Sequence, residues 1–387
     1  MRTEDANSVQ NYLDLNQEAF LDFLKLLVET ESPSRNAASQ VKIIRIIKSQ
    51  FEDLDYYCTH NKGSITGGYL YARPKIRNKA LPLQLIVGHC DTVWPLGTIE
   101  NMPFSSENGK LKGPGVYDMK VGIAQVIFAL KTIKDLDLSY HVTPVVLINS
   151  DEEIGSHEST HVIKMLSKIS NRAFVMEPPL GLDGKLKTAR KGVGRFLITV
   201  KGKAAHAGLD PSKGISAILE LSHQIQQLYA MNDPKEGVTV NVGMIEGGIS
   251  ANVVAPESKA VVDVRVLNSD QGQMITEKIK NLKPKSKEVS LIIQGGIGRP
   301  PMEYTERNQS LWNLAKKEGK DLGLNLKRAI AGGGSDGNTT SQFTATLDGL
   351  GTPGDGAHAN HEFVYKSKIK ERLALLVALL LSKPIIH

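Results

Sequence analysis

Cysteine is scarce in this chain, and so are the long apolar runs that would place it in a membrane. Only Cys58 and Cys90 occur among 387 residues, too few for a disulfide framework. A single bridge between them stays open, although reduced thiols in a cytoplasm are the simpler interpretation. The first seven residues are polar and carry acids, unlike a secretory signal, and no stretch of about 18 apolar residues occurs. We therefore expect a cytoplasmic protein without a membrane span.

The chain also lacks a basic segment interleaved with aromatic residues, the pattern that favours binding of single-stranded nucleic acid. Lys and Arg number 47 against 41 Asp and Glu, which gives a net charge of +6. The basic residues are scattered, as Lys164, Lys185 and Lys316 illustrate. We expect no nucleic-acid partner, and a positive field that favours anionic substrates.

The first half of the chain alternates strand-like and helix-like runs. Residues 83–88, 142–149 and 172–176 are apolar and strand-like, and 120–134 places apolar residues at helical spacing. This alternation predicts an α/β domain with a mostly parallel sheet flanked by helices. Ligands of such sheets gather at the carboxyl ends of the strands.

The middle of the chain follows another pattern, strand-helix-strand-strand-helix-strand, which is the split βαβ or ferredoxin-like plan of a small α+β domain. The expected strands are 194–201, 238–245, 259–267 and 289–294, and the expected helices are 214–229 and 270–282. Helix, strand and helix then return, ending in a helix over 369–381. With a length that favours two domains, we predict a catalytic domain of residues 1–189 and 300–387, interrupted by an inserted domain of residues 190–299.

Metal-type side chains follow the apolar runs at four places. They are His89 with Asp91, Asp118, Asp151-Glu152-Glu153 and Glu177. Taken singly, such a residue is usually a cap or a hydrogen-bonded core group. Asp118 would suit the N-cap of the next helix, and the Asp-Glu-Glu run would suit a solvated loop. Together they predict a cation site, because carboxylates gathered at one sheet edge repel one another unless they are paired or bind a cation.

The types of ligand favour zinc. Imidazole nitrogen and carboxylate oxygen suit this ion, and the absence of clustered cysteines argues against a structural thiolate site. A carboxylate shared by two cations would hold them about 3.5–4 Å apart, and Asp118, which ends a Gly-Pro-Gly loop, is the natural bridge. Glu152 and Glu153 are adjacent, so one can face a cation while the other takes a proton from water and passes it to a leaving nitrogen.

These residues lie in longer motifs. The motifs are Gly88-His89-Cys90-Asp91-Thr92-Val93, Gly113-Pro114-Gly115-Val116-Tyr117-Asp118-Met119-Lys120, Asp151-Glu152-Glu153-Ile154-Gly155-Ser156, Glu177-Pro178 and Gly202-Lys203-Ala204-Ala205-His206-Ala207-Gly208. The set resembles the dinuclear zinc amidohydrolases and exopeptidases, which include glutamate carboxypeptidase, acetylornithine deacetylase, succinyl-diaminopimelate desuccinylase and aminoacylase. The likeness runs from about Leu13 to the C-terminal helix. It is greatest to glutamate carboxypeptidase, through Gly298-Arg299-Pro300 and Gly332-Gly333-Gly334-Ser335-Asp336 as well.

The resemblance implies two Zn²⁺ per subunit, with Co²⁺ or Mn²⁺ as substitutes. His89 and Glu177 would bind one ion, Glu153 and His358 the other, and Asp118 would bridge them. The family has a His about four residues before a Glu near the C-terminus. His358 therefore fits better than His361, since it has that spacing from Glu362.

The resemblance also implies roles beyond the ligands. Glu152 would be the general base and acid, and Asp91 would orient His89. The inserted domain would form a homodimer, in which His206 reaches the partner's site and polarises the scissile carbonyl. Arg265 and Arg299, with Asn252 beside them, would bind a substrate carboxylate, because a guanidinium offers two parallel hydrogen bonds.

Some features depart from the family pattern or fit it loosely. Cys90 replaces a variable residue next to His89, where a thiol could affect metal binding or oxidation. Glu177 stands where some members have Asp. The triple glycine 332–334 is no phosphate loop, since no Gly-Lys-Ser/Thr follows, and it predicts either close approach of the backbone to a substrate or a plain turn.

From these motifs we expect a metallohydrolase that cleaves an amide bond next to a free carboxylate, as in release of a C-terminal amino acid from a small peptide. The alternative within the family is a deacylase or desuccinylase of N-acyl amino acids. A non-catalytic binding protein on the same fold is a third interpretation. The intact Glu152 argues against it, because a binding protein has no use for a proton acceptor at that place.

Overall fold

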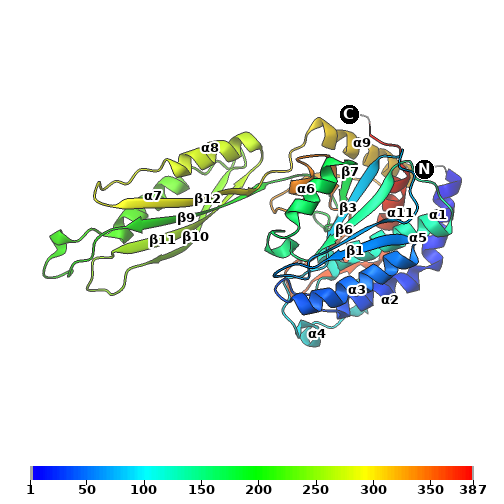
Figure 1. Cartoon of the computed structure of the whole chain (residues 1–387), viewed down its shortest axis with the longest axis horizontal. Helices are drawn as coiled ribbons and strands as arrows, with labels where there is room; N and C mark the ends of the chain where they lie inside the picture. Colours follow the sequence, from blue (N-terminus) through cyan, green and yellow to red (C-terminus); the bar gives the residue numbers. More distant parts are fainter. Residues whose placement is uncertain (1–2, 386–387) are drawn as a thin grey trace. The chain divides into compact units, whose positions relative to one another are not determined.

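The computed structural model describes residues 3–385 and forms two compact units (Figure 1). The first unit contains residues 3–188, 304–330 and 335–385, and the second contains residues 189–303 and 331–334. No helix within 3–385 combines the length and the apolar character needed to cross a membrane.

An eight-stranded sheet of order β1-β2-β6-β3-β7-β14-β8-β13 forms the centre of the first unit. Its strands are β1 Tyr56–Asn61, β2 Tyr69–Pro74, β3 Leu83–His89, β6 Thr143–Asn149, β7 Ser170–Val175, β8 Leu186–Arg190, β13 Arg328–Ala331 and β14 Ala345–Asp348. The four central strands β6, β3, β7 and β14 are parallel. The pairs β1/β2, β2/β6 and β14/β8 are antiparallel. The predicted mostly parallel sheet is confirmed, with antiparallel strands added toward its edges.

The parallel strands bury side chains on both faces. Ile86, Val146 and Phe174 belong to the core shared with α2 (Gln17–Glu29), α5 (Val121–Asp135) and α11 (Lys366–Leu381). The alternate residues Leu85 and Val145 pack with α6 (Thr160–Lys168) on the other face. Figure 1 shows α6 on the opposite side of the sheet from α5 and α11. Burial on two faces favours strands that are apolar along most of their length, which is why the sequence shows them as apolar runs.

A smaller antiparallel sheet in the first unit joins two distant segments. Its order is β15 (Gly354–Asp355), β16 (Phe363–Tyr365), β5 (Lys110–Lys112) and β4 (Ser105–Glu107). It places the segment before Asp118 beside the segment that contains His358. The other helices of this unit are α1 Thr3–Leu15, α3 Ala37–Asp53, α4 Thr98–Asn101, α9 Glu306–Asp321 and α10 Asp336–Thr340.

The second unit has the predicted split βαβ plan. Its antiparallel sheet has the order β10-β11-β9-β12. The elements are β9 Gly192–Lys201, α7 Ala217–Tyr229, β10 Thr239–Gly247, β11 Glu257–Val266, α8 Ser269–Lys280 and β12 Ser290–Arg299. Apolar residues of α7 and α8 share one core with alternate residues of the strands, such as Val262 and Val264. The other face of the sheet is not part of that core, and its intervening positions carry both polar residues, such as Lys259 and Asp263, and apolar ones, such as Val193.

One helix begins later than the sequence predicts. The expected start at Gly214 relied on Asp210-Pro211, but Pro211–Lys213 forms a separate helical turn. Helix α7 starts at Ala217, where the Ser216 side chain accepts a hydrogen bond from the Leu219 amide at 3.2 Å. The proline thus starts a short turn of its own, and serine caps the main helix.

Candidate metal centre

Parallel pairing brings the ends of β3, β6 and β7 to one edge of the sheet. His89, the last residue of β3, pairs in register with Asn149, the last residue of β6. The turn 151–153 follows β6, and Glu177 follows β7. Three of the predicted groups of metal-type residues therefore meet at this edge, because parallel strands end together there.

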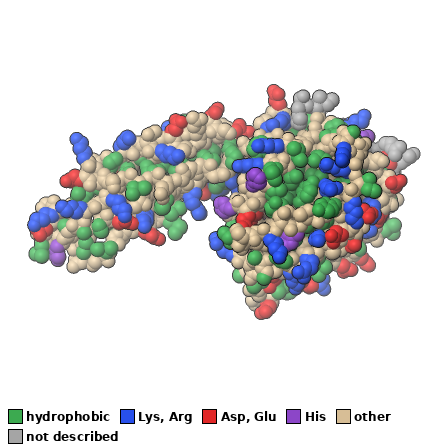
Figure 2. Space-filling view, viewed as in Figure 1, with side chains coloured by type: hydrophobic (Ala, Val, Ile, Leu, Met, Phe, Trp, Pro, Cys, Tyr) green, Lys and Arg blue, Asp and Glu red, His purple; other side chains and the backbone are tan. Residues whose placement is uncertain are grey.

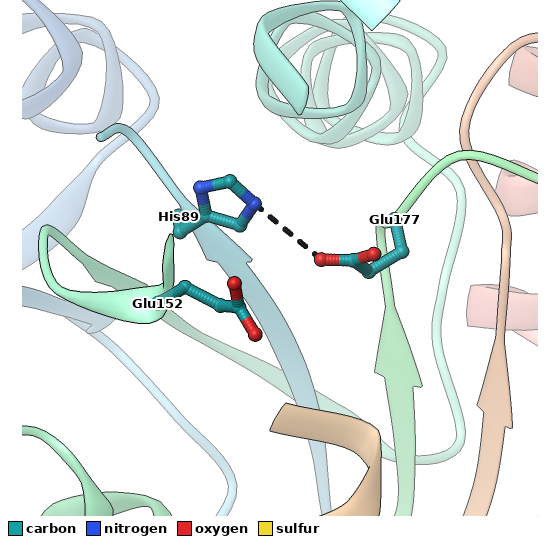
Figure 3. Close-up of side chains that lie close together, drawn as sticks. All are labelled: His89, Glu152 and Glu177. Carbon is teal, nitrogen blue, oxygen red and sulfur yellow. Dashed lines mark ion pairs between the residues drawn. The ribbon is translucent and has the colours of Figure 1, made fainter. Parts of the chain in front are cut away.

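The His89 ring lies between carboxylates on both sides. It is 2% exposed, and its Nε2 lies 3.2 Å from Asp118 Oδ1 and 3.4 Å from Glu177 Oε1. Figure 3 shows the Glu152 carboxylate directed toward the region between His89 and Glu177, and ligand atoms of these three residues lie within 4.8 Å of one another. Nε2 thus faces the space where a cation could be held by several donors at once.

The second oxygen of Asp118 faces a second histidine. Asp118 Oδ2 lies 3.6 Å from His358 Nε2, and that nitrogen is 3.0 Å from Glu153 Oε2. One carboxylate therefore has an imidazole at each of its oxygens, as a bridging ligand requires. Gly115 has φ of +73° in the loop before Asp118, and a Cβ there would lie 2.6 Å from Thr92 Cγ2. The glycine that made this loop recognisable is therefore needed for it.

Two local interpretations of the sequence are wrong. Helix α5 begins at Val121 after Lys120, and no side chain caps it, so Asp118 is not its N-cap. The run 151–153 is no solvated loop either, because Asp151 is 1% exposed and the Glu153 side chain is 7% exposed.

His361 is exposed, and no ion pair of its ring occurs among residues 3–385, whereas His358 lies beside Glu153.

Asp91 is completely buried and has two kinds of contact. Its Oδ1 lies 3.4 Å from His89 Nδ1, and the Asp91 carbonyl oxygen lies 3.0 Å from the same nitrogen. Its carboxylate also accepts hydrogen bonds from the amides of Glu152 and Glu153, each at 3.2 Å, and from the Ser34 hydroxyl at 2.7 Å. Asp91 therefore contacts His89 and also fixes the turn that holds both glutamates, a link that the sequence did not reveal.

The cluster needs added positive charge. Burial raises the pKa of Glu153 to about 7, although its hydrogen bond with His358 acts in the other direction. The same bond raises the pKa of His358 to about 9. Burial acts to lower the pKa of His89, but hydrogen bonds with Asp118, Asp91 and Glu177 raise it well above its usual value. Protons or divalent cations can supply this charge, and metal uptake would release protons.

The donor set fits borderline divalent ions rather than thiolate-bound ones. Cys90 is fully buried, and burial raises the pKa of its thiol far above the usual range. It is therefore a neutral thiol and a poor ligand. Cys58 and Cys90 are both free, which excludes the bridge that the sequence left open. Imidazole and carboxylate donors remain, as zinc, cobalt or manganese would use.

His206 lies in an exposed turn of the second unit. Its Nδ1 accepts hydrogen bonds from the amides of Gly208 and Leu209, both at 3.1 Å. The neutral ring must then carry its hydrogen on Nε2, which leaves an N–H donor available. Asn252 lies in a neighbouring segment, and its carbonyl accepts a hydrogen bond from the Ala207 amide at 2.9 Å.

Arg265 and Arg299 lie in one row across the sheet of the second unit. Val193 on the central strand β9 pairs in register with Arg265 on β11 and with Arg299 on β12. Residues paired in this way point to one face. This is the face away from the helices, because the neighbours Val264 and Val266 point into the core. The Arg265 guanidinium makes two hydrogen bonds with Asp263, at 2.8 and 3.0 Å.

Two residues at the candidate metal centre were not predicted from the sequence. Lys187 Nζ lies 3.9 Å from Glu177 Oε2, with both side chains 9% exposed. Glu362 served only as a marker of spacing, yet its carboxylate contacts the loop of Asp118. Neither role has a local signal, since each depends on segments far apart in the chain. The triple glycine is likewise fixed from a distance, because the Arg190 guanidinium donates to the carbonyls of Gly333 and Gly334.

The cluster of imidazoles and carboxylates at the carboxyl edge of this α/β sheet is the kind of donor set that metal-dependent hydrolases use. The chain belongs to peptidase family M20/M25/M40, whose model matches residues 85–382. It is thus a metallopeptidase, and the resemblance found in its motifs is confirmed. Carboxypeptidase G2 of Pseudomonas sp. (strain RS-16) is 27% identical over 374 residues, which cover 94% of this chain and 89% of that protein.

Solved structures share the fold. The aminopeptidase PepT of Bacillus cereus ATCC 10987 has a TM-score of 0.80 at 21% identity, over 94% of this chain and 98% of that one. The YXEP protein of Bacillus subtilis, described as a dinuclear metal-binding peptidase of family M20, has a TM-score of 0.71 at 16% identity. That match covers 95% of this chain and 98% of the other. The predicted combination of α/β unit and split βαβ unit is therefore one that this fold shares with known peptidases.

Proposed function

We propose that the protein is a dinuclear zinc carboxypeptidase that releases the C-terminal amino acid of small peptides. The observation that carries the proposal is the Asp118 carboxylate, which has His89 at one oxygen and His358 at the other. The similarity to carboxypeptidase G2 over nearly the whole chain supports the choice of substrate.

In this proposal His89 and Glu177 hold one Zn²⁺, Glu153 and His358 hold the other, and Asp118 is shared. When bound, the ions would polarise the scissile carbonyl and lower the pKa of the attacking water. Co²⁺ or Mn²⁺ would be substitutes, because the donors are nitrogen and oxygen only.

Glu152 is the proposed proton carrier. It takes a proton from water as the water oxygen bonds to the carbonyl carbon, and it gives the proton to the leaving nitrogen as the C–N bond breaks. Asp91 holds the backbone of Glu152 and contacts His89, so it positions both groups. His206 would donate its Nε2 hydrogen to the carbonyl oxygen.

A first prediction separates the two candidate ligands near the C-terminus. Replacing His358 by Ala should lower the zinc content of reconstituted protein toward one ion per subunit, because Glu153 and Asp118 lose their shared partner. His361→Ala should keep the wild-type content, since that ring contacts no carboxylate of the cluster. Metal analysis after dialysis measures the zinc content of both variants. A loss of zinc in His361→Ala but not in His358→Ala would make His361 the ligand instead.

A second prediction concerns the substrate carboxylate. We propose that Arg265 and Arg299 bind it from their common row. Asn252, predicted to lie beside them, lies beyond the other end of β11 and next to His206, so it would assist only from a partner subunit. Arg299→Met and Arg265→Met should each lower kcat/KM for a dipeptide by about 30-fold, equivalent to ~2 kcal/mol for a lost charged hydrogen-bond pair. The matched control is the same dipeptide with a C-terminal amide. If each variant lowers kcat/KM by the same factor for the dipeptide acid and for its amide, the arginines do not bind that carboxylate.

The proposed assembly is a homodimer formed through the inserted domain, residues 190–299. Strand β10 lies at the edge of its sheet, and edge strands offer unpaired backbone groups. Large apolar side chains are exposed on β10 and on α7, among them Met244 (60%), Ile245 (64%) and Leu219 (60%). Figure 2 shows hydrophobic side chains on the surface of this unit. A two-fold pairing would cover such a patch, and sedimentation equilibrium would test it.

The compartment is proposed to be the cytoplasm, because both cysteines are free. Cell fractionation would test this.

The substrate class would be tested by hydrolysis of dipeptides ending in glutamate, aspartate or glycine and of N-acyl amino acids, with added Zn²⁺, Co²⁺ or Mn²⁺. Faster cleavage of N-acyl amino acids than of any dipeptide would show that the enzyme is a deacylase and not a carboxypeptidase.

A further inference from the structure

Glu362 is a buried carboxylate that receives hydrogen bonds from four N–H groups. Its side chain is 1% exposed. Oε1 accepts from the backbone amides of Tyr117 at 2.8 Å and Asp118 at 3.1 Å. Oε2 accepts from the backbone amide of Gly115 at 2.9 Å and from the indole Nε1 of Trp94 at 2.8 Å. Each oxygen is therefore paired with two donors.

The four donors belong to segments that carry the proposed ligands. Trp94 follows shortly after His89, and the three amides belong to the loop that ends in Asp118. Glu362 itself lies just beyond His358, in the connection between β15 and β16. One carboxylate thus joins the three segments that supply His89, Asp118 and His358, which contact one another at the metal centre.

The donor set needs a carboxylate and tolerates no amide. A glutamine in the same place would turn an NH₂ group toward two N–H donors, whichever way its amide is oriented. Charge also matters, because hydrogen bonds to an ionised acceptor are about twice as strong as neutral ones. An isosteric Glu362→Gln change should therefore disturb the loop 113–118 with little change in volume.

We propose that Glu362 is the positioning residue of the metal centre. It holds the loop of Asp118 against the segments of His89 and His358, so that the shared carboxylate and both histidines stand ready for two cations. The part that concerns cations rests on the proposed function, whereas the clamp on the loop does not.

The clamp is tested in metal-free protein by amide hydrogen exchange. Glu362→Gln should raise the exchange rate of peptides covering 113–118 by at least about tenfold, because three of their amides lose a charged acceptor. The matched control is Glu220→Gln in the second unit. Glu220 is 3% exposed and accepts from the amides of Lys285 at 2.9 Å and Ser286 at 3.0 Å. That variant should raise exchange near 285–286 only. Unchanged exchange at 113–118 in Glu362→Gln would overturn the clamp.

The consequence for metal binding is tested by titration with Co²⁺. Glu362→Gln should bind the ion about 10–100-fold more weakly than wild type, the usual cost of losing a group that supports ligands, and the visible absorption of bound Co²⁺ should change. Glu220→Gln should match wild type in both. Faster exchange at 113–118 with wild-type Co²⁺ affinity would overturn the positioning role. A wild-type protein that fails to bind two ions contradicts the proposed metal centre, and the exchange experiment then still decides the clamp.

If Glu362→Gln does not fold, Trp94→Phe tests both the hold of Glu362 on the loop 113–118 and its effect on Co²⁺ binding. It removes one of the four donors and leaves the other three. We expect faster exchange at 113–118 and about a tenfold loss of Co²⁺ affinity, the lower end of the same range. Wild-type values for both would overturn the proposal.

Discussion

Glu152→Gln should lower kcat by about 10²–10⁴, the contribution of general acid and base catalysis, while the zinc content stays that of wild type. The amide has the shape of the carboxyl group but cannot take a proton from water. The side chain lies beside His89 and Glu177, where the proposed reaction would take place (Figure 3). Steady-state kinetics and metal analysis on the same preparation measure the two quantities.

The neighbour Glu153 provides the matched control. Its carboxylate contacts His358 directly, so Glu153→Gln should lower both metal content and activity. Glu152 could also act as a ligand, because its oxygen belongs to one group of closely spaced donors with His89 and Glu177. Loss of zinc in Glu152→Gln would show that Glu152 is a metal ligand. A near-normal kcat with full zinc content would show that Glu152 takes no part in the reaction.

The metal-type residues at strand ends were predictable because their strands are buried on both faces. Such strands appear as apolar runs, so a polar residue at the end of each is conspicuous, as with His89 and Glu177. Asp118 was recognisable from a Gly-Pro-Gly loop that the structure needs. His358 was predicted from its spacing to Glu362, and it lies beside Glu153, as that choice requires.

Long-range backbone contacts were not predictable. The hydrogen bond between Tyr117 and Glu362 joins residues 245 positions apart, and nothing near Glu362 indicates which amides it will meet. Asp91 was expected to orient His89, but its bonds to the amides of Glu152 and Glu153 depend on how two loops fold together. The row of Arg265, Val193 and Arg299 depends on strand register, which the hydrophobic pattern alone leaves open.

Mixing two inactive variants should restore activity if His206 acts across a dimer. His206→Ala removes the proposed donor to the carbonyl oxygen, which typically costs about 10²–10³ in kcat. Glu152→Gln removes the proton carrier. In a mixed dimer, the His206→Ala subunit keeps Glu152 and receives His206 from its partner, so one of the two sites has both groups.

Recovery should approach about a quarter of the wild-type rate, since half of the dimers would be mixed and each would have one complete site in a two-fold assembly. The geometry of His206 favours this role, because both Gly208 and Leu209 donate to Nδ1 and leave the Nε2 hydrogen for another acceptor. Subunit exchange has to be measured in the same sample, by energy transfer between labelled variants. A mixture of two His206→Ala preparations is the control and should stay inactive. If subunits exchange and no activity returns, His206 acts within its own chain or takes no part in the reaction.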